Sequence, residues 1–244
     1  MRFLPTILLA TAISTPALAQ DCISTELALV ADVSSSMSSG EREIQRAGYA
    51  SAFRSGEVFD AIQNSYCGAI AVAYIEFGST PHIIADWFVI QTDEDAEYFA
   101  QEIEAAETLK TGPSGTLTGL ARAIRFAGES LDANGITADR SVMDVSADGG
   151  DNIENGCTNG KHTHNAVQIA RDELTTPSAE NGWREVVINA LPIVGGQNSG
   201  TCGMSLTDYM DEFVRGGAGS FLMEANGVSD LPRIVREKLA QEIG

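Results

Sequence analysis

The feature that most constrains the fold of this chain is a regular alternation of short apolar runs with amphipathic segments. Runs that read as buried strands and segments with helical spacing follow one another from residue 27 to the end of the sequence. Such alternation predicts an α/β fold, a doubly wound, mostly parallel open sheet with helices on both faces. The predicted strands are 27–31, 69–77, 82–90, 141–147, 186–194 and 220–223, and the predicted helices are 38–53, 92–105, 120–131, 166–174, 206–214 and 228–243.

Local signals refine this pattern. The tight turn 78–81 is too short for a crossover, so it predicts one antiparallel hairpin in the sheet. Ser38 and Glu41 have the spacing of a capping box at the start of the first helix. In that helix, apolar residues recur at helical spacing at Ile44, Ala47, Ala50 and Phe53. Asp144 lies inside a strand, where an unpaired charge is costly, so it needs a partner that the pattern does not identify.

The first 19 residues have the pattern of a signal peptide. Arg2 is followed by an apolar stretch over 3–13, and residues 17–19 form a small-x-small cleavage signal. We therefore expect one domain over 20–244, in a protein that is periplasmic or secreted and not inserted in a membrane. The chain has 15 Lys and Arg against 34 Asp and Glu, a net charge of -19. This charge argues against binding to nucleic acid or to an anionic membrane surface.

Three polar clusters stand at the ends of predicted elements. Residues 32–36 directly follow the first strand, residues 115–118 precede a helix, and residues 146–150 surround the end of the fourth strand. Ligands of open α/β sheets bind beyond the carboxyl ends of the strands, so these clusters are expected to converge there. Their carboxylate and hydroxyl oxygens are suited to a hard divalent cation.

This set of residues closely resembles the metal-ion-dependent adhesion site of von Willebrand factor type A domains. The D-x-S-x-S part is matched by Asp32, Ser34 and Ser36, and the late aspartate by Asp148. The threonine of the pattern is best matched by Thr116, with Thr118 as the second choice. Segments 43–49, 144–149 and 188–193 further resemble a bacterial exported subgroup of this superfamily that has no known function.

The resemblance implies a Rossmann-like von Willebrand factor A fold and a bound Mg²⁺, with Mn²⁺ or Ca²⁺ as alternatives. It implies a non-catalytic, adhesion-type module that captures an acidic side chain of a protein partner through the cation. We expect the module to act as a monomer. One alternative is a structural or assembly component of the envelope. Another alternative is a hydrolase, which could be metal-dependent or could use a serine nucleophile. The serine would be Ser36, beside His162 or His164 and Asp148. The chain has no G-x-S-x-G elbow, which argues against the serine hydrolase.

Four cysteines in an exported chain predict two disulfides, with three pairings open from the count alone. The sheet order implied by the resemblance makes the strands after Cys22 and Cys67 neighbours. It also places Cys157 and Cys202 in loops at the same end of the sheet. We therefore predict the pairs Cys22–Cys67 and Cys157–Cys202. This pairing leaves little room for a zinc site of Cys157 with His162-x-His164, and the acidic loop 148–154 is only a weak candidate for a second cation.

Overall fold

A computed structural model describes residues 22–106, 115–178, 184–195 and 200–244. The predicted signal peptide and part of the turn before residue 115 lie outside the described residues. Within them, six strands form one sheet in the order β3-β2-β1-β4-β7-β8. The bounds are β1 Ile23–Asp32, β2 Ile70–Phe77, β3 Pro81–Ile90, β4 Ala138–Ala147, β7 Val186–Val194 and β8 Ala225–Asn226. All neighbouring pairs are parallel except β2 and β3, which confirms the predicted fold class and its antiparallel strand.

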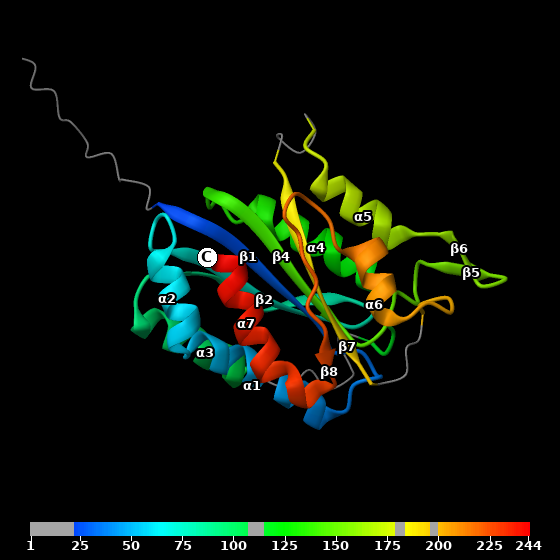
Figure 1. The fold of residues 1–244 in the computed structure, drawn as a ribbon, viewed down its shortest axis with the longest axis horizontal. Helices are drawn as coiled ribbons and strands as arrows, with labels where there is room; N and C mark the ends of the chain where they lie inside the picture. The colour runs from blue at the N-terminus through cyan, green and yellow to red at the C-terminus, as the bar shows by residue number, and fades with distance from the viewer. Residues whose placement is uncertain (1–21, 107–114, 179–183, 196–199) are drawn as a thin grey trace, which may run out of the picture.

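Helices cover both faces of the sheet (Figure 1). On one face lie α1 Ser39–Phe53, α2 Gly56–Asn64, α3 Asp93–Ala105 and α7 Leu231–Ile243; on the other lie α4 Leu120–Ala133, α5 Ala166–Thr175, α6 Leu206–Tyr209 and the π-helical turn Met210–Val214. Strand β1 shows why two layers form. Leu27 and Leu29 enter the core under the first group, whereas Ala28 and Val30 enter the core under the second. A strand buried on both faces reads as a continuous apolar run.

Several local predictions are confirmed and some are wrong. Ser38 and Glu41 form the capping box of α1, but Ile44 and Ala47 are exposed, and α1 instead buries Arg42, Gln45 and Arg46 beside its apolar residues. The strand predicted at 220–223 is wrong, because the last strand is Ala225–Asn226 and Leu222 makes only an isolated bridge. The sequence missed helix α2 and a hairpin of β5 Gly156–Thr158 and β6 Lys161–His164, which projects from the body (Figure 1).

Both predicted disulfides are confirmed. Cys22–Cys67 joins the segments that lead into β1 and β2, with Cα atoms 5.4 Å apart. Cys157–Cys202 ties the β5–β6 hairpin to the segment before α6, with Cα atoms 5.6 Å apart. Each closes a loop of 45 positions, a constraint worth about 4 kcal/mol in the chain-entropy model. Among the described residues, no helix is long and apolar enough to cross a membrane.

The structure identifies the partner of Asp144 as Lys238 of α7. The Lys238 ammonium contacts Asp144 Oδ1 at 2.5 Å and also binds Glu242 one helical turn away, and all three side chains are fully buried. Asn189 of β7 donates a hydrogen bond of 2.8 Å to Glu242 Oε1. The side chains of Asp144 and Glu242 thus share one ammonium in the core, which couples α7 to the centre of the sheet. Burial raises the pKa of Glu242 to about 7, and the neighbouring Asp144 carboxylate adds to that rise.

This raised pKa predicts a pH-dependent stability. Folded Glu242 keeps its proton up to about pH 7, whereas its ordinary pKa is 4.5. Protonated Glu242 therefore contributes fully to the free energy of unfolding below pH 4.5, and this contribution is lost as the pH rises to about 7. The total change is about 3 kcal/mol. In the Glu242→Gln variant, the free energy of unfolding should depend less on pH over this range. Urea unfolding in chelator from pH 4.5 to 8 measures it. Parallel profiles of the wild type and the variant would contradict the assignment.

Candidate metal site

The parallel pairing of β1 and β4 brings the two predicted aspartates to one edge of the sheet. Asp32 is the last residue of β1, and Asp148 directly follows the last residue of β4. The strands are in register up to Ala31 opposite Ser146. Because neighbouring parallel strands end at the same edge, both carboxyl groups lie there, and both are buried.

Two serines link the aspartates through hydrogen bonds. The Ser34 amide donates to Asp32 Oδ1 at 2.8 Å, which fixes the turn after β1. The hydroxyls of Ser34 and Ser36 are 3.0 Å apart, and the Ser36 hydroxyl donates to Asp148 Oδ1 at 2.7 Å. Asp32, Ser34, Ser36 and Asp148 are thus brought together as the sequence predicts.

The two threonines occupy different places. Thr118 is buried, and its hydroxyl donates to Ser34 Oγ at 3.2 Å. The side chain of Thr116 is exposed, and it is the main-chain carbonyl of Thr116 that accepts hydrogen bonds from the amide and hydroxyl of Ser35, at 3.1 and 2.7 Å. The structure therefore brings the second choice, Thr118, to the hydroxyl cluster in place of the preferred Thr116.

The loop around Thr118 explains this difference. The Thr118 amide donates to Asn152 Oδ1 at 2.9 Å, and the Asn152 amide donates back to the Thr118 carbonyl at 3.1 Å. The Leu117 amide donates to Ser79 Oγ at 3.1 Å. These contacts with residues distant in sequence orient the loop so that Thr118 points inward, and no pattern in 115–118 encodes them.

The electrostatics of the site favour a positive charge. Burial, and then the nearby Asp148 carboxylate, raise the pKa of Asp32 to about 8. Burial also raises the pKa of Asp148. Asp32 Oδ2 is buried and has no hydrogen-bond partner among the described residues. In the described part of the chain, no basic side chain pairs with either carboxyl group. Two desolvated carboxyl groups in this state are costly, and a cation placed between them would reduce that cost.

The acidic loop after Asp148 does not form a second cation site of this kind. Asp151 is buried, and its Oδ1 accepts hydrogen bonds from the amides of residues 153–155, while its Oδ2 accepts from the Ala121 amide at the start of α4. Glu154 pairs with Arg122 and Arg125. In the described part of the chain, no group of three or more His, Cys, Asp or Glu side chains could hold a metal ion. The converging donors are two carboxylates and three hydroxyls.

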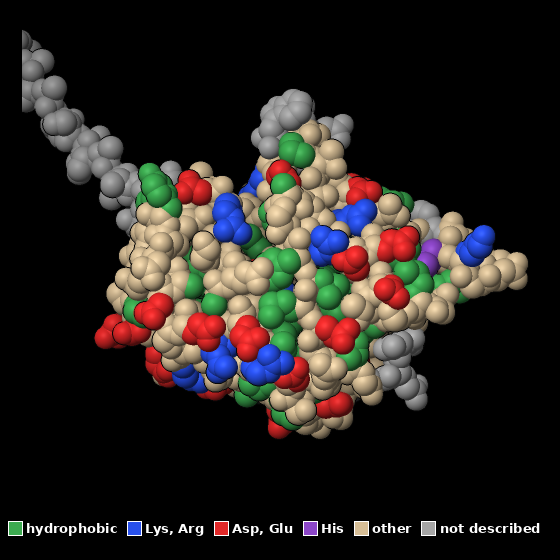
Figure 2. All heavy atoms as spheres, in the orientation of Figure 1, with side chains coloured by type: hydrophobic (Ala, Val, Ile, Leu, Met, Phe, Trp, Pro, Cys, Tyr) green, Lys and Arg blue, Asp and Glu red, His purple; other side chains and the backbone are tan. Residues whose placement is uncertain are grey.

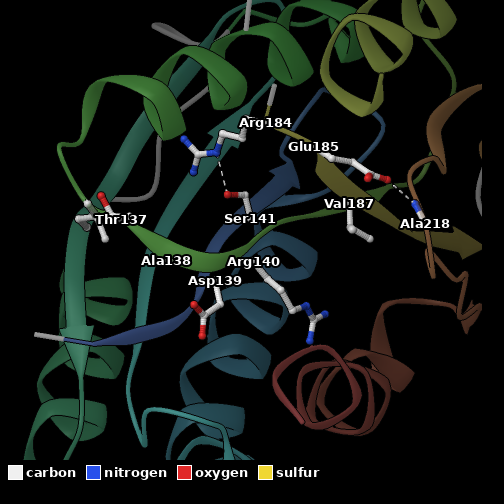
Figure 3. Close-up of a pocket in the computed structure, with 10 residues that line it drawn as sticks. Thr137, Ala138, Asp139, Arg140, Ser141, Arg184, Glu185, Val187 and Ala218 are labelled. Carbon is white, nitrogen blue, oxygen red and sulfur yellow. Dashed lines mark hydrogen bonds between the residues drawn. The ribbon is translucent and has the colours of Figure 1, made fainter. Parts of the chain in front are cut away.

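Two other regions contain polar side chains that could take part in chemistry: the candidate zinc region around His162, and a cavity that only the structure reveals. The His162 ring packs against Tyr209 and Phe213, with ring centroids 5.5 and 5.0 Å away, and Cys157 is committed to its disulfide. A cavity of about 680 Å³ lies at the amino ends of β4 and β7, the opposite edge of the sheet from the aspartates (Figure 3). Its Arg184 is bonded to Ser141 Oγ, and Glu185 accepts from the Ala218 amide.

The architecture is that of a von Willebrand factor type A-like domain, and solved structures with the same fold support this class. A von Willebrand factor type A protein from Catenulispora acidiphila is 14% identical with a TM-score of 0.55, and the match covers 91% of this chain and 43% of that one. The pilus adhesin SpaC from Lactobacillus rhamnosus GG is 14% identical with a TM-score of 0.56, covering 92% of this chain and 31% of that one.

A third structure of this fold carries a metal. Proximal thread matrix protein 1 from the mussel byssus, with a zinc-occupied MIDAS motif, is 13% identical with a TM-score of 0.52, covering 91% of this chain and 48% of that one. At these identities the likeness concerns the fold, and the chain spans less than half the length of each of these three proteins.

Within this class, the chain belongs to the family described as "Protein of unknown function (DUF1194)", whose model matches residues 21–244. The predicted membership in a subgroup without known function is thereby confirmed. A comparison with curated proteins gives no match.

The repulsion between the two aspartates can be measured without any partner. Asp148→Asn removes a like charge beside Asp32 and keeps an oxygen that can accept from Ser36. We expect the free energy of unfolding in chelator at pH 9, above the Asp32 pKa, to rise by about 1 kcal/mol. As a control, Asp151→Asn should lower it, because its carboxylate oxygens accept main-chain amides. A less stable Asp148→Asn variant would contradict the assignment.

Proposed function

We propose that this chain is an exported, non-catalytic binding module that captures an acidic side chain of a protein partner through a bound divalent cation. The observation that carries the proposal is the hydrogen-bonded chain from Asp32 through Ser34 and Ser36 to Asp148. Thr118 joins it through Ser34. The ion would be held by Asp32, Ser34, Ser36, Thr118 and Asp148, with Thr118 taking the role that the sequence favoured for Thr116.

The donor set fits Mg²⁺, with Mn²⁺ and Ca²⁺ as alternatives. Hard cations take oxygen ligands, and Mg²⁺ usually keeps some of its water. Three of the five donors are neutral hydroxyls, so the ion would retain much of its charge and attract a further carboxylate. Asp32 Oδ2, which has no hydrogen-bond partner within the residues that the structure describes, is an oxygen that the ion or its water could bind. The zinc in the MIDAS motif of the mussel protein supports metal binding in this fold.

The partner is expected to be a protein outside the cytoplasm. Two disulfides are typical of a chain that matures in an oxidising compartment, which supports a periplasmic or secreted location. The net charge of -19 argues against nucleic acid, and acidic and basic side chains are interspersed on the face shown in Figure 2. Leu117 is 46% exposed in the loop that carries Thr118, so an apolar group beside the partner's carboxylate would find a contact.

A role as an assembly component of the envelope remains the alternative, and it would use the same site. A serine hydrolase is less favoured, because the Ser36 hydroxyl donates to Asp148 and the His162 ring packs against Tyr209 and Phe213. Labelling of Ser36 by a fluorophosphonate probe would favour that hydrolase.

The two threonines give a matched test of the metal site. Thr118→Ala should weaken Mg²⁺ binding at least about tenfold, because it removes an oxygen donor from the cluster. Thr116→Ala should bind Mg²⁺ as the wild type does, because its side chain is exposed and the variant keeps the carbonyl that holds Ser35. Isothermal titration of the metal-free proteins with MgCl₂ measures both. Loss of binding in Thr116→Ala alone would contradict the assignment of Thr118.

Carboxylate capture can be tested with displayed peptides that each contain one Asp or Glu among neutral residues. We expect binders in Mg²⁺ that are released by chelator. Replacing the acidic residue of a binder by Asn or Gln should abolish its binding, because the neutral amide gains little from the ion. Binding that persists in chelator, or that tolerates the amide, would contradict the proposal.

A further inference from the structure

The loop that presents Ser34 and Ser36 is held by a buried arginine of the following helix. Arg42 lies in the first turns of α1 and is 8% exposed. Its Nη1 donates to the carbonyl of Met37 at 3.0 Å and to that of Val33 at 3.4 Å. Val33 immediately precedes Ser34, and Met37 immediately follows Ser36. One guanidinium nitrogen therefore joins the two ends of the three-serine loop.

Gln45 extends this contact to the strand. It lies one turn further along α1, is fully buried, and donates from Nε2 to the carbonyl of Asp32 at 3.0 Å. Arg42 and Gln45 thus bind the main chain at residues 32, 33 and 37, so helix α1 holds the whole segment between Asp32 and Met37. The Ser38–Glu41 capping box fixes the start of the helix that carries both side chains.

These contacts act on the main chain and leave the side-chain oxygens of the site free. Among the described residues, the partners found for the Arg42 guanidinium are main-chain carbonyls, and no carboxylate pairs with it. A buried guanidinium without an ion-pair partner is costly to keep. The two contacts of Arg42 with the ends of the serine loop are suited to fixing the main-chain conformation of that loop.

We propose that Arg42, assisted by Gln45, is a positioning residue of the metal site that fixes the loop so that the hydroxyls of Ser34 and Ser36 face Asp148. This inference rests on the proposed function, because the cation is the ligand whose affinity the loop would set. Groups that orient metal ligands commonly change metal affinity by about ten- to a hundredfold. Arg42 would act in this way through the main chain.

The test compares Arg42→Met with Arg46→Met. Arg46 lies one turn along α1, is also buried, and binds Glu76 and the Ala106 carbonyl instead of the serine loop. In chelator, hydrogen exchange of the amides of residues 34–37 should be faster in Arg42→Met and unchanged in Arg46→Met. In titrations with MgCl₂, Arg42→Met should bind about ten- to a hundredfold more weakly, and Arg42→Lys should recover part of the loss. Arg46→Met should bind Mg²⁺ with the wild-type affinity. It should unfold at a lower urea concentration, because it leaves the buried Glu76 without its ion-pair partner.

The outcomes separate the two proposals. If the wild type binds Mg²⁺ and a folded Arg42→Met variant binds it equally well, the positioning role is wrong and the proposed function stands. If the wild type binds none of Mg²⁺, Mn²⁺ and Ca²⁺ in such titrations, the proposed function fails and the inference fails with it. Should Arg42→Met not fold, Gln45→Met provides the same two measurements, because it removes the contact to the Asp32 carbonyl and keeps a similar volume. Unchanged exchange and affinity in Gln45→Met would then overturn the inference.

Discussion

The parallel pairing of β1 and β4 is the constraint on which the rest of this structure depends. It places Asp32 and Asp148, which are 116 positions apart in sequence, at the same edge of the sheet in a buried environment. Two carboxyl groups held together without a counter-charge destabilise the fold unless something compensates. The serine hydroxyls offset part of this cost through their hydrogen bonds. The part that they do not offset makes this edge of the sheet suited to a cation.

The face of the sheet covered by α1 and α7 contains more buried charge than an apolar core requires. Arg46 forms a buried ion pair with Glu76 of β2, and Lys238 binds Asp144 of β4. Buried ion pairs add little net stability compared with apolar packing, although removing one partner is costly. They do fix where each helix sits. On this face, directional contacts hold α1 against β2 and α7 against β4, while the serine loop of the site is held by the separate main-chain contacts of Arg42 and Gln45.

Much of the site could be predicted because its residues stand at the ends of elements with strong periodic signals. Because the strand is apolar from Leu27 to Ala31 and ends at Asp32, the sequence places that aspartate at the carboxyl end of the strand. Thr118 could not be separated from Thr116 in this way. Which of them points inward depends on Asn152, a residue 34 positions away that bonds to the Thr118 main chain. The β5–β6 hairpin was missed because its strands have only three and four residues. Helix α2 is only nine residues long, but it could have been predicted from its N-cap Ser55 and from the buried Val58 and Ile62 four positions apart.

The sequence by itself determined the layered α/β architecture, the antiparallel strand, the capping box at Ser38 and the aspartates and serines of the candidate site. Together with the family resemblance it also gave the cysteine pairing. These features follow from local periodicity and from the order of elements along the chain. Only the tertiary structure decided that Thr118 joins the cluster, that Lys238 neutralises Asp144, and that Arg42 and Gln45 face inward where Ile44 and Ala47 do not. Each of those outcomes depends on which polar groups meet across the fold, because a buried donor or acceptor goes where its partner is, and local spacing does not encode that partner.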